Sequence, residues 1–419
     1  MIIVKAKVRL REYKHIPIKI SGAKNSSLPI IAASILCDEV VTLENVPIIK
    51  DVLILVNILK DIGYKLDFDK ENNKMKIYPC NIKRKHFYNN KINKLRGSYY
   101  LMGALIGKND FVNFSFLYPG GCNLGERPIN YHLNAFSNMG LKITTNRKSI
   151  HIKGYKKSIT HNLLYPSVGT TINILLASCK LNETTIINNA SIEPEVIDVC
   201  NFLKSMGVNI TINNRCICMT GNSYLKQTNY KIMEDRIEAG TYLILGALHN
   251  GITITNINPL NLDYLTNLLG KIGYTLQITN DTITLNSFNK KNIKPFNIIL
   301  EPHPGFPTDL GPLLCVLASQ INGTSIITET VFKDRFNHIE ELKKMNIDIS
   351  LDINKIIIKG ISEVINSTIK ATDLRCAASL LLASSINSNF STIEDIDYLF
   401  RGYEDIKEKL DSLGIDFIV

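Results

Sequence analysis

The chain has 419 residues, too many for one ordinary hydrophobic core, so we expect two domains or one large repeat assembly. Lysine and arginine exceed aspartate and glutamate by 48 − 38 = 10, which favours anionic partners such as phosphorylated small molecules. Nine cysteines without a C-x-x-C pair indicate neither a disulfide framework nor a zinc site, and no apolar run has the length of a membrane span. We therefore expect a reduced, soluble, cytoplasmic protein.

One apolar pattern recurs six times along the chain, at intervals of 66 to 77 residues. Each copy has helical spacing before a central residue and strict alternation after it, which predicts a helix, a left-handed turn and a strand. The central residues are Gly63, Gly140, Gly207, Gly273, Asn346 and Gly414.

A second helix is expected upstream in most copies, followed by another alternating strand. The expected helices cover residues 28–36, 171–177, 241–248, 313–318 and 377–383. A unit of this size can bury its helices only against sister units. Three units closing around their own helices make a domain, so six units predict two domains.

In the second copy, residues 118–128 read YPGGCNLGERP. Three glycines after a proline exclude a helix or a strand interior, so we expect a loop that is able to move. Free cysteines are mostly buried small hydrophobes, but this loop offers Cys122 few apolar neighbours. Arg127 is close enough in sequence to favour a thiolate or to bring an anionic substrate beside the thiol.

Two other stretches carry charge at the start of apolar helices. Residues 21–26, SGAKNS, place Lys24 and Asn25 where free backbone N–H groups favour an anion, although a helix N-cap beside a surface lysine is an equal alternative. Residues 302–309, PHPGFPTD, contain three prolines, so we expect a rigid loop that holds Asp309 in a fixed position. The alternative is that Thr308 or Asp309 merely caps the helix that follows.

Three later arginines complete the set of candidate cations. Arg335, Arg375 and Arg401 are each weak signals, because a surface arginine is the default reading. Arg375 and Arg401 lie at element boundaries beside the repeat helices, as do Lys24 and Arg127. In a repeat fold these positions can converge on one cleft.

Taken together, the motifs SGAKNS, GGCNLGERP, PSVGTTIN, DRIEAGTY, PGFPTD, TDLR and RGYEDI resemble the UDP-N-acetylglucosamine 1-carboxyvinyltransferase family, the enolpyruvyl transferases of peptidoglycan synthesis. The resemblance runs from about residue 21 to the C-terminus. It implies an α/β fold of two inside-out, barrel-like domains, each built from three βαβαββ units. The expected domains are 21–233, which carries the Cys122 loop, and 1–20 with 234–419, and the active site is expected in the cleft between them.

The resemblance also implies a reaction, in which the enolpyruvyl group of phosphoenolpyruvate passes to the 3'-hydroxyl of UDP-N-acetylglucosamine and phosphate is released. It assigns Asp309 as base, Cys122 as acid, and Lys24, Arg127 and Arg401 as catalytic cations. The residues expected to bind phosphoenolpyruvate are Lys24, Asn25, Arg127, Arg375 and Arg401. Those expected to bind the UDP-sugar are Asn25, Arg96, Arg127, Pro128, Ile129, Asn130, Tyr131, Ser167, Val168, Gly169, Asp309, Val331 and Arg335.

No cofactor or metal is required by such a mechanism, because fixed cations can stabilise the charges. The implied protein is a fosfomycin target and a monomer that acts on small molecules, without nucleic acid or membrane. Two alternatives are a 3-phosphoshikimate 1-carboxyvinyltransferase and a catalytically degenerate binding protein of the same fold. Lys24→Ala and Arg401→Ala are expected to abolish turnover and leave the fold intact, since neither side chain is expected to fill core volume.

Overall fold

The computed structural model describes residues 4–81, 86–88, 90–120, 129–332 and 334–419. Their contacts divide the chain into two compact units. Unit 1 contains the described residues of 4–21 and 234–419, and unit 2 contains those between 22 and 233. The chain therefore passes from unit 1 to unit 2 after Ser21 and returns after Met233.

Unit 2 holds three repeats that follow one another in the sequence. The first consists of α1 (Lys24–Ser34), β3 (Val41–Glu44), α2 (Lys50–Ile62), β4 (Leu66–Asp69) and β5 (Lys74–Ile77). The second consists of β6 (His86–Phe87), α3 (Tyr100–Lys108), β7 (Phe111–Leu117), α4 (Asn130–Asn138), β8 (Lys142–Thr145) and β9 (Ser149–Tyr155). The third consists of β10 (Thr160–Asn162), α5 (Val168–Ser178), β11 (Thr184–Asn188), α6 (Pro194–Ser205), β12 (Asn209–Asn213) and β13 (Cys216–Thr220).

Unit 1 repeats the same order of elements. Its first repeat consists of α7 (Arg236–Leu248), β15 (Ile252–Thr255), α8 (Asp263–Ile272), β16 (Leu276–Ile278) and β17 (Thr282–Leu285). The next consists of β18 (Asn297–Leu300), α9 (Gly311–Ser319), β19 (Gly323–Glu329), α10 (Asn337–Lys343), β20 (Asp348–Asp352) and β21 (Lys355–Gly360). The last consists of β22 (Thr368–Lys370), α11 (Leu374–Ser384), β23 (Ser391–Glu394), α12 (Ile406–Ser412) and β24 (Ile415–Ile418).

Among the described residues, each repeat forms one four-stranded sheet, and three short strands complete sheets that lie far away in the sequence. Strand β2 (Pro17–Lys19) pairs in parallel with β15, and β14 (Thr228–Lys231) pairs in parallel with β3. Strand β1 (Lys5–Leu10) lies between β23 and β24 and is antiparallel to both. Strand β2 therefore completes a sheet of unit 1 just before the chain enters unit 2, and β14 completes a sheet of unit 2 just before the chain returns.

All six central residues of the repeat adopt the left-handed conformation, as the sequence pattern predicts. Their φ angles are 111°, 90°, 105°, 117° and 80° at Gly63, Gly140, Gly207, Gly273 and Gly414, and 62° at Asn346. Glycine has no Cβ to clash in this region, and asparagine tolerates it better than most residues. The helix–turn–strand prediction is therefore confirmed in each copy.

Helix α3 is the one upstream helix that the pattern did not reveal. It is buried over nearly all of its surface and contains Gly103 and Gly107, so it shows no amphipathic period. A Cβ at Gly103 would lie 2.4 Å from the side-chain oxygen of Asn173, and one at Gly107 would lie 2.2 Å from the carbonyl oxygen of Leu176, both in α5. These glycines let the two helices approach closely.

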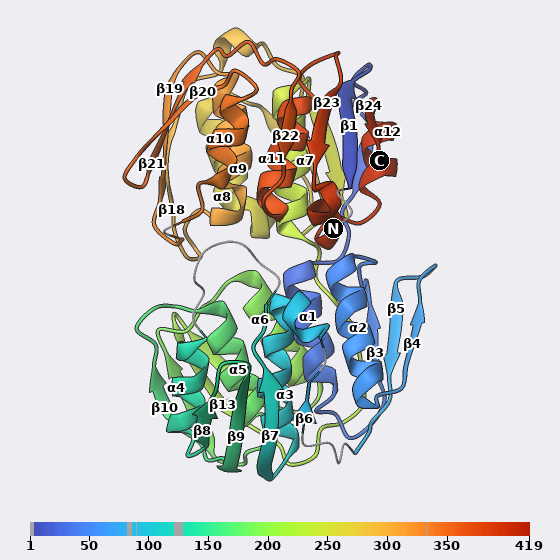
Figure 1. Ribbon diagram of the computed structural model, residues 1–419, viewed down its shortest axis with the longest axis vertical. Coiled ribbons are helices and arrows are strands. Elements are labelled where there is room, and N and C mark those ends of the chain that lie inside the picture. Colours follow the sequence, from blue (N-terminus) through green and yellow to red (C-terminus); the bar gives the residue numbers. More distant parts are fainter. Residues whose placement is uncertain (1–3, 82–85, 89, 121–128, 333) are drawn as a thin grey trace. The chain divides into compact units, whose positions relative to one another are not determined.

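Each unit has its own hydrophobic core, built around its central helices. In unit 1, Figure 1 shows α7, α9 and α11 between the sheet of β18–β21 on one side and that of β1, β23 and β24 on the other. The strands alternate buried and exposed residues, so one face of each sheet covers the helices and the other meets solvent. No helix in the described part of the chain combines the length and apolar character needed to cross a membrane.

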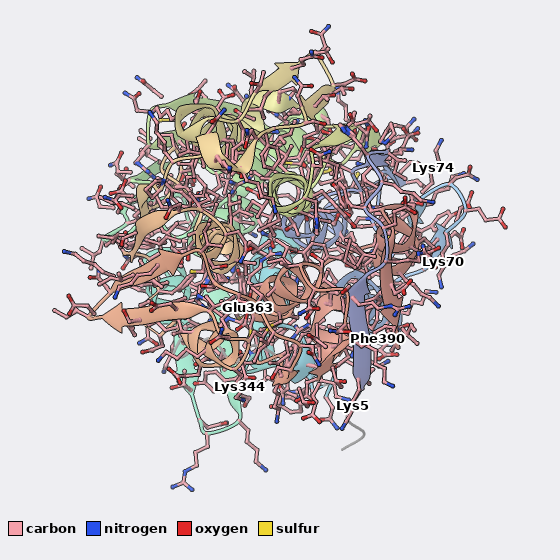
Figure 2. All side chains as sticks on the ribbon, turned by 90° about the horizontal axis from the view of Figure 1, so that it is seen from above. Lys5, Lys70, Lys74, Lys344, Glu363 and Phe390 are labelled. Carbon is pink, nitrogen blue, oxygen red and sulfur yellow. The ribbon has the colours of Figure 1, made fainter. Side chains whose placement is uncertain are left out.

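Both units carry exposed lysines on their surfaces. Lys5 and Lys344 of unit 1, and Lys70 and Lys74 of unit 2, are all exposed (Figure 2). Lys5 pairs with Glu394 at 2.7 Å, Lys344 with Glu341 at 2.7 Å and Lys74 with Glu44 at 3.0 Å. Exposed pairs of this kind contribute little to stability, about 0–1 kcal/mol each.

Gly270 in α8 and Gly273 directly after this helix allow a direct test of the repeat geometry. Gly270 is exposed within the helix, and a Cβ there would meet nothing within 4 Å, so Gly270→Ala is expected to stabilise unit 1 by about 0.5–1 kcal/mol. Gly273 has φ 117°, and its Cβ would lie 2.9 Å from the carbonyl oxygen of Asn292. Gly273→Ala is therefore expected to destabilise the protein by about 1–2 kcal/mol. Urea unfolding of both variants measures the two effects, and equal signs would contradict the assignment.

Candidate functional site

In unit 1, the carboxylate of Asp309 is held by two arginines from different elements. Asp309 lies in a short 3-10 helix, η5 (Thr308–Leu310), directly before α9. Its Oδ1 lies 2.7 Å from a guanidinium nitrogen of Arg335, and its Oδ2 lies 2.7 Å from one of Arg375. The Asp309 side chain is 23% exposed, whereas both arginines are buried. Helix α9 has no side-chain cap, so Asp309 does not serve as the helix cap that was its alternative interpretation.

The two arginines determine the ionisation of Asp309. Burial alone would raise its pKa, but the charges of Arg375 and Arg335, with their hydrogen bonds, outweigh burial and hold the pKa well below its usual range. The carboxylate is therefore ionised at every physiological pH. It accepts hydrogen bonds in this state, and weaker ion pairs would make it a stronger base.

Glu329, which no sequence motif selects, accepts hydrogen bonds from three residues near Asp309. It is buried at the end of β19 and accepts hydrogen bonds from the backbone N–H groups of Val331 at 2.6 Å and Phe332 at 3.1 Å. It also accepts a hydrogen bond from the hydroxyl of Thr308. Thr308 in turn accepts one from Arg335 at 3.0 Å. Through Glu329, the structure brings Val331 and Arg335 next to the loop of Asp309.

Arg375 is positioned by the start of α11. Asp373 caps this helix and accepts hydrogen bonds from the backbone N–H groups of Arg375 at 2.9 Å and Cys376 at 3.2 Å. The Arg375 guanidinium also donates to the hydroxyl of Tyr403, at 3.4 Å. The 3-10 helix that ends in Arg401, η6 (Ile396–Arg401), packs against α11, and Arg401 is half-buried. One cluster in unit 1 thus contains Asp309, Arg335, Arg375 and Val331. Arg401 lies on a neighbouring element.

In unit 2, Lys24 is the first residue of α1, and Asn25 beside it is exposed. The Lys24 ammonium lies 2.8 Å from the carboxylate of Asp51, in the first turn of α2. Only 14% of the Lys24 side chain and 4% of the Asp51 side chain are exposed. The Lys24 side chain is thus largely buried, although it was expected to fill no core volume, and its charge balances a buried carboxylate.

Lys24→Ala is expected to abolish turnover and also to destabilise unit 2, by up to about 3 kcal/mol, because it breaks a largely buried ion pair. The double variant Lys24→Ala/Asp51→Asn should recover most of the stability but none of the activity. A matched control is Lys91→Ala, which breaks an exposed pair with Asp61 of the same helix α2 and should cost less than about 1 kcal/mol. Urea unfolding and a phosphate-release assay separate the two effects. Wild-type turnover in the double variant would remove Lys24 from the site.

Unit 2 also brings Arg96 and Gly169 together around a buried histidine. Arg96 begins a 3-10 helix, η2 (Arg96–Tyr99), and its guanidinium carbon lies 5.8 Å from the centre of the Tyr99 ring. The Tyr99 and His132 rings are 4.8 Å apart. A Cβ at Gly169 would lie 2.8 Å from the Tyr99 hydroxyl and 2.9 Å from the His132 ring, so only glycine fits there.

His132 was not selected from the sequence, because a lone histidine among the polar and apolar residues of NYHLNAFSN has no distinguishing signal. It is buried in α4 and lies 2.9 Å from the side-chain nitrogen of Asn173 in α5. Burial, with a smaller effect of Arg96, lowers the pKa of His132 to about 3. The histidine is therefore neutral at physiological pH and packs as a polar core residue.

The other residues expected at the UDP-sugar lie at the starts of α4 and α5. Ile129 is buried just before α4, whereas Asn130 and Tyr131 in its first turn are exposed. Ser167 caps α5, accepting a hydrogen bond from the backbone N–H of Thr170 at 3.3 Å, and Val168 is half-buried. Two adjacent helix N-termini, with their free N–H groups, are suited to an anionic ligand.

Cys122, Arg127 and Pro128 lie outside the described residues, so the roles expected for them stay predictions. Among the residues that are described, no group of three or more histidine, cysteine, aspartate or glutamate side chains is arranged to hold a metal ion. The expected site residues that are described include five cations suited to bind anions, namely Lys24, Arg96, Arg335, Arg375 and Arg401.

The family profile described as EPSP synthase (3-phosphoshikimate 1-carboxyvinyltransferase) matches residues 14–410. A UDP-N-acetylglucosamine 1-carboxyvinyltransferase from Halothermothrix orenii is 39% identical over 402 residues, which cover 95% of both chains. A second protein, UDP-N-acetylglucosamine 1-carboxyvinyltransferase 2 from Bacillus subtilis, is 37% identical over 95% of this chain and 92% of its own. A third, a UDP-N-acetylglucosamine 1-carboxyvinyltransferase from Thermotoga petrophila, is 35% identical over 95% of this chain.

Solved structures support the same fold. The enolpyruvyl transferase NikO from Streptomyces tendae superposes with a TM-score of 0.90 at 23% identity, covering 99% of this chain and 98% of its own. An EPSP synthase from Acinetobacter baumannii superposes with a TM-score of 0.75 at 18% identity, covering 99% and 100%. The expected α/β fold of six βαβαββ repeats is thereby confirmed. The chain belongs to the enolpyruvyl transferase family, and its 35–39% identical relatives within that family are UDP-N-acetylglucosamine 1-carboxyvinyltransferases.

Proposed function

We propose that the chain transfers the enolpyruvyl group of phosphoenolpyruvate to the 3'-hydroxyl of UDP-N-acetylglucosamine and releases phosphate, the first committed step of peptidoglycan precursor synthesis. The observation that carries the proposal is the 35–39% identity to enzymes of that name over 95% of this chain. The residues agree with it, because anionic substrates need cations and the chain supplies them at Lys24, Arg375 and Arg401. The substrates are small molecules, and we propose that a monomer in the cytoplasm acts on them without nucleic acid.

In the proposed mechanism, the sugar 3'-oxygen forms a bond to C2 of phosphoenolpyruvate and gives up its proton to Asp309. Cys122 protonates C3, which leaves a tetrahedral adduct. C3 then returns a proton to Cys122, the bond from C2 to the phosphate oxygen breaks, and the phosphate leaves with the proton that Asp309 took up, so that the enolpyruvyl ether remains. Lys24, Arg127 and Arg401 balance the charge of the phosphate and carboxylate groups.

The ion pairs of Asp309 add a condition to this mechanism. A carboxylate held between Arg335 and Arg375 has a lowered pKa and is a poor proton acceptor. Anionic substrate groups compete with Asp309 for these arginines, so substrate binding should weaken both ion pairs and make the carboxylate more basic. The proposal therefore requires phosphoenolpyruvate or the UDP-sugar to contact at least one of the two guanidinium groups.

The test is phosphate release from phosphoenolpyruvate with one acceptor at a time. With UDP-N-acetylglucosamine, phosphate and the enolpyruvyl ether should appear in equal amounts. With 3-phosphoshikimate, release should stay at the level without acceptor, because the relatives that are 35–39% identical to the chain are named for UDP-N-acetylglucosamine. Turnover with 3-phosphoshikimate would favour the second activity of this family, and release with neither would favour a binding protein of the same fold.

We also propose that the sites of the two units serve one reaction, with the domains divided at residues 21 and 233. The support is the resemblance, which assigns phosphoenolpyruvate contacts to Lys24 in unit 2 and to Arg375 and Arg401 in unit 1. Isothermal titration of phosphoenolpyruvate into Lys24→Ala and Arg401→Ala tests this. Loss of phosphoenolpyruvate binding in both variants would support one shared site. Loss of binding in only one of the two variants would contradict it.

A further inference from the structure

A pair of thiols lies on the outer face of unit 2, apart from every residue assigned to enolpyruvyl transfer. The strand β13 reads CICMT, and its alternation buries Ile217 and Met219 in the core. Cys216 and Cys218 therefore point to the other face of the sheet, and both are half-exposed. Their sulfur atoms are 3.9 Å apart.

The two sulfur atoms face neutral surroundings on this sheet. Cys218 is opposite Thr211 of β12 and Ile186 of β11, and Cys216 is opposite Asn213 of β12. Burial, followed by the hydrogen bond and charge of Cys216, raises the pKa of Cys218. Cys218 therefore favours its protonated form, and a ligand that bonds to this sulfur must release the proton.

The spacing of the sulfur atoms suits a bridging ion better than a disulfide. Residues i and i+2 of an extended strand have Cα atoms about 6.8 Å apart, at the upper limit for a disulfide, whose sulfurs must approach to about 2.05 Å. An ion with bonds of about 2.3 Å to sulfur would span the observed 3.9 Å with an S–ion–S angle of about 115°. A linear two-coordinate centre would need its two sulfur atoms about 4.6 Å apart. A pyramidal or trigonal centre can bond to both sulfurs after only a small rotation of the two side chains.

We propose that Cys216 and Cys218 form a two-thiol site that binds thiophilic compounds with a pyramidal centre, of the class of trivalent arsenicals. A monosubstituted arsenical, R–As=O, reacts with two thiols to form two As–S bonds. The oxygen leaves as one water molecule with the two thiol protons, and no electrons change hands. Soft thiolate ligands are the ones such centres prefer.

The experiment uses the full-length protein and phenylarsine oxide, followed by intact-protein and peptide mass spectrometry. One adduct should form on the peptide that holds Cys216 and Cys218. A dithiol such as dimercaptopropanesulfonate should reverse it, whereas the monothiol glutathione should not. Cys216→Ser and Cys218→Ser should each lose the adduct. Both substitutions lie on an exposed face, so the variants should fold, and circular dichroism checks that they do.

Two further variants serve as matched controls. Cys80→Ser removes a half-exposed thiol elsewhere in unit 2, and Cys122→Ser removes the proposed catalytic thiol; both should keep the adduct. An adduct that persists in Cys216→Ser and Cys218→Ser, or that glutathione reverses, would overturn the proposal. So would the absence of an adduct on the wild-type peptide.

Discussion

Asp309→Asn is expected to lower the rate of enolpyruvyl transfer by about 10²- to 10⁴-fold, the usual contribution of a positioned general base. The amide keeps the shape of the carboxylate and can still accept a hydrogen bond from Arg335 or Arg375, but it cannot take the proton of the sugar hydroxyl. Substrate binding should therefore survive better than turnover. Rapid-quench measurement of single turnovers, with titration of the UDP-sugar, distinguishes a loss of chemistry from a loss of binding.

The matched control is Asp334→Asn, which changes an exposed aspartate next to Arg335 and should leave turnover within a few-fold of wild type. If Asp309→Asn turned over at a similar rate to this control, Asp309 would be an ion-pair residue and not the base. If UDP-sugar affinity fell as steeply as turnover, the carboxylate would act in binding.

Asp309→Ala is expected to destabilise unit 1 by about 3–5 kcal/mol at pH 7, because it leaves two buried arginines without their carboxylate. The folded-state pKa of Asp309 is lowered, so its contribution to stability is fully present above the unfolded-state pKa of about 3.9 and is lost as the pH falls below that value. The stability difference between wild type and Asp309→Ala should therefore be constant from about pH 5 to pH 8 and shrink at lower pH. Urea unfolding across this range measures it, and a difference that grew on acidification would contradict the ion pairs.

Cys122→Ser is expected to lose nearly all activity, whereas Cys122→Asp should keep a measurable fraction of it. A donor to C3 of an enol must carry a proton at working pH and still release it. A thiol with a pKa of about 8.5 and a carboxyl group raised by its pocket can both do this, but a serine hydroxyl cannot. Steady-state phosphate release from the three proteins gives the comparison, and wild-type turnover in the serine variant would exclude Cys122 as the acid.

The same residue should react with an epoxide phosphonate of the fosfomycin type. This reaction needs a sulfur nucleophile and the cations that hold the phosphonate, so the adduct should form on Cys122 and be absent from Cys122→Asp. Of the other eight cysteines, five are buried, and Cys80, Cys216 and Cys218 are half-exposed. These three are the internal controls, and peptide mass spectrometry that found the adduct on any of them would contradict the assignment.

The repeat is the part of the fold that was readable from the sequence. A left-handed turn strongly favours glycine or asparagine, so Gly63 and its five counterparts mark the same place in every copy. Helix α3 escaped detection because an all-apolar helix with two glycines has no period to detect. The family assignment followed from motifs such as GGCNLGERP, in which several unusual residues occur together.

The site was only partly readable. The motifs pointed to Lys24, Asp309 and Arg375. Nothing in the motifs indicates which oppositely charged residue each of these side chains pairs with. Lys24 proved to be paired with the buried Asp51, and Glu329 and His132 have roles that no local pattern announces. Each depends on a partner in another element, and the choice of partner is made by packing.

The sequence by itself determined where the helices end, how many repeats there are and which family the chain belongs to, because each depends on one residue or a short run of residues with a local conformational or chemical requirement. Only the tertiary structure decided that β2 pairs with the distant strand β15 and β14 with the distant strand β3. It also decided that arginines hold both oxygens of Asp309, one of them from 66 residues away. Strand pairing uses backbone groups that every residue has, and an ion pair needs only opposite charges. Neither therefore specifies its partner until the cores have packed and brought one candidate within reach.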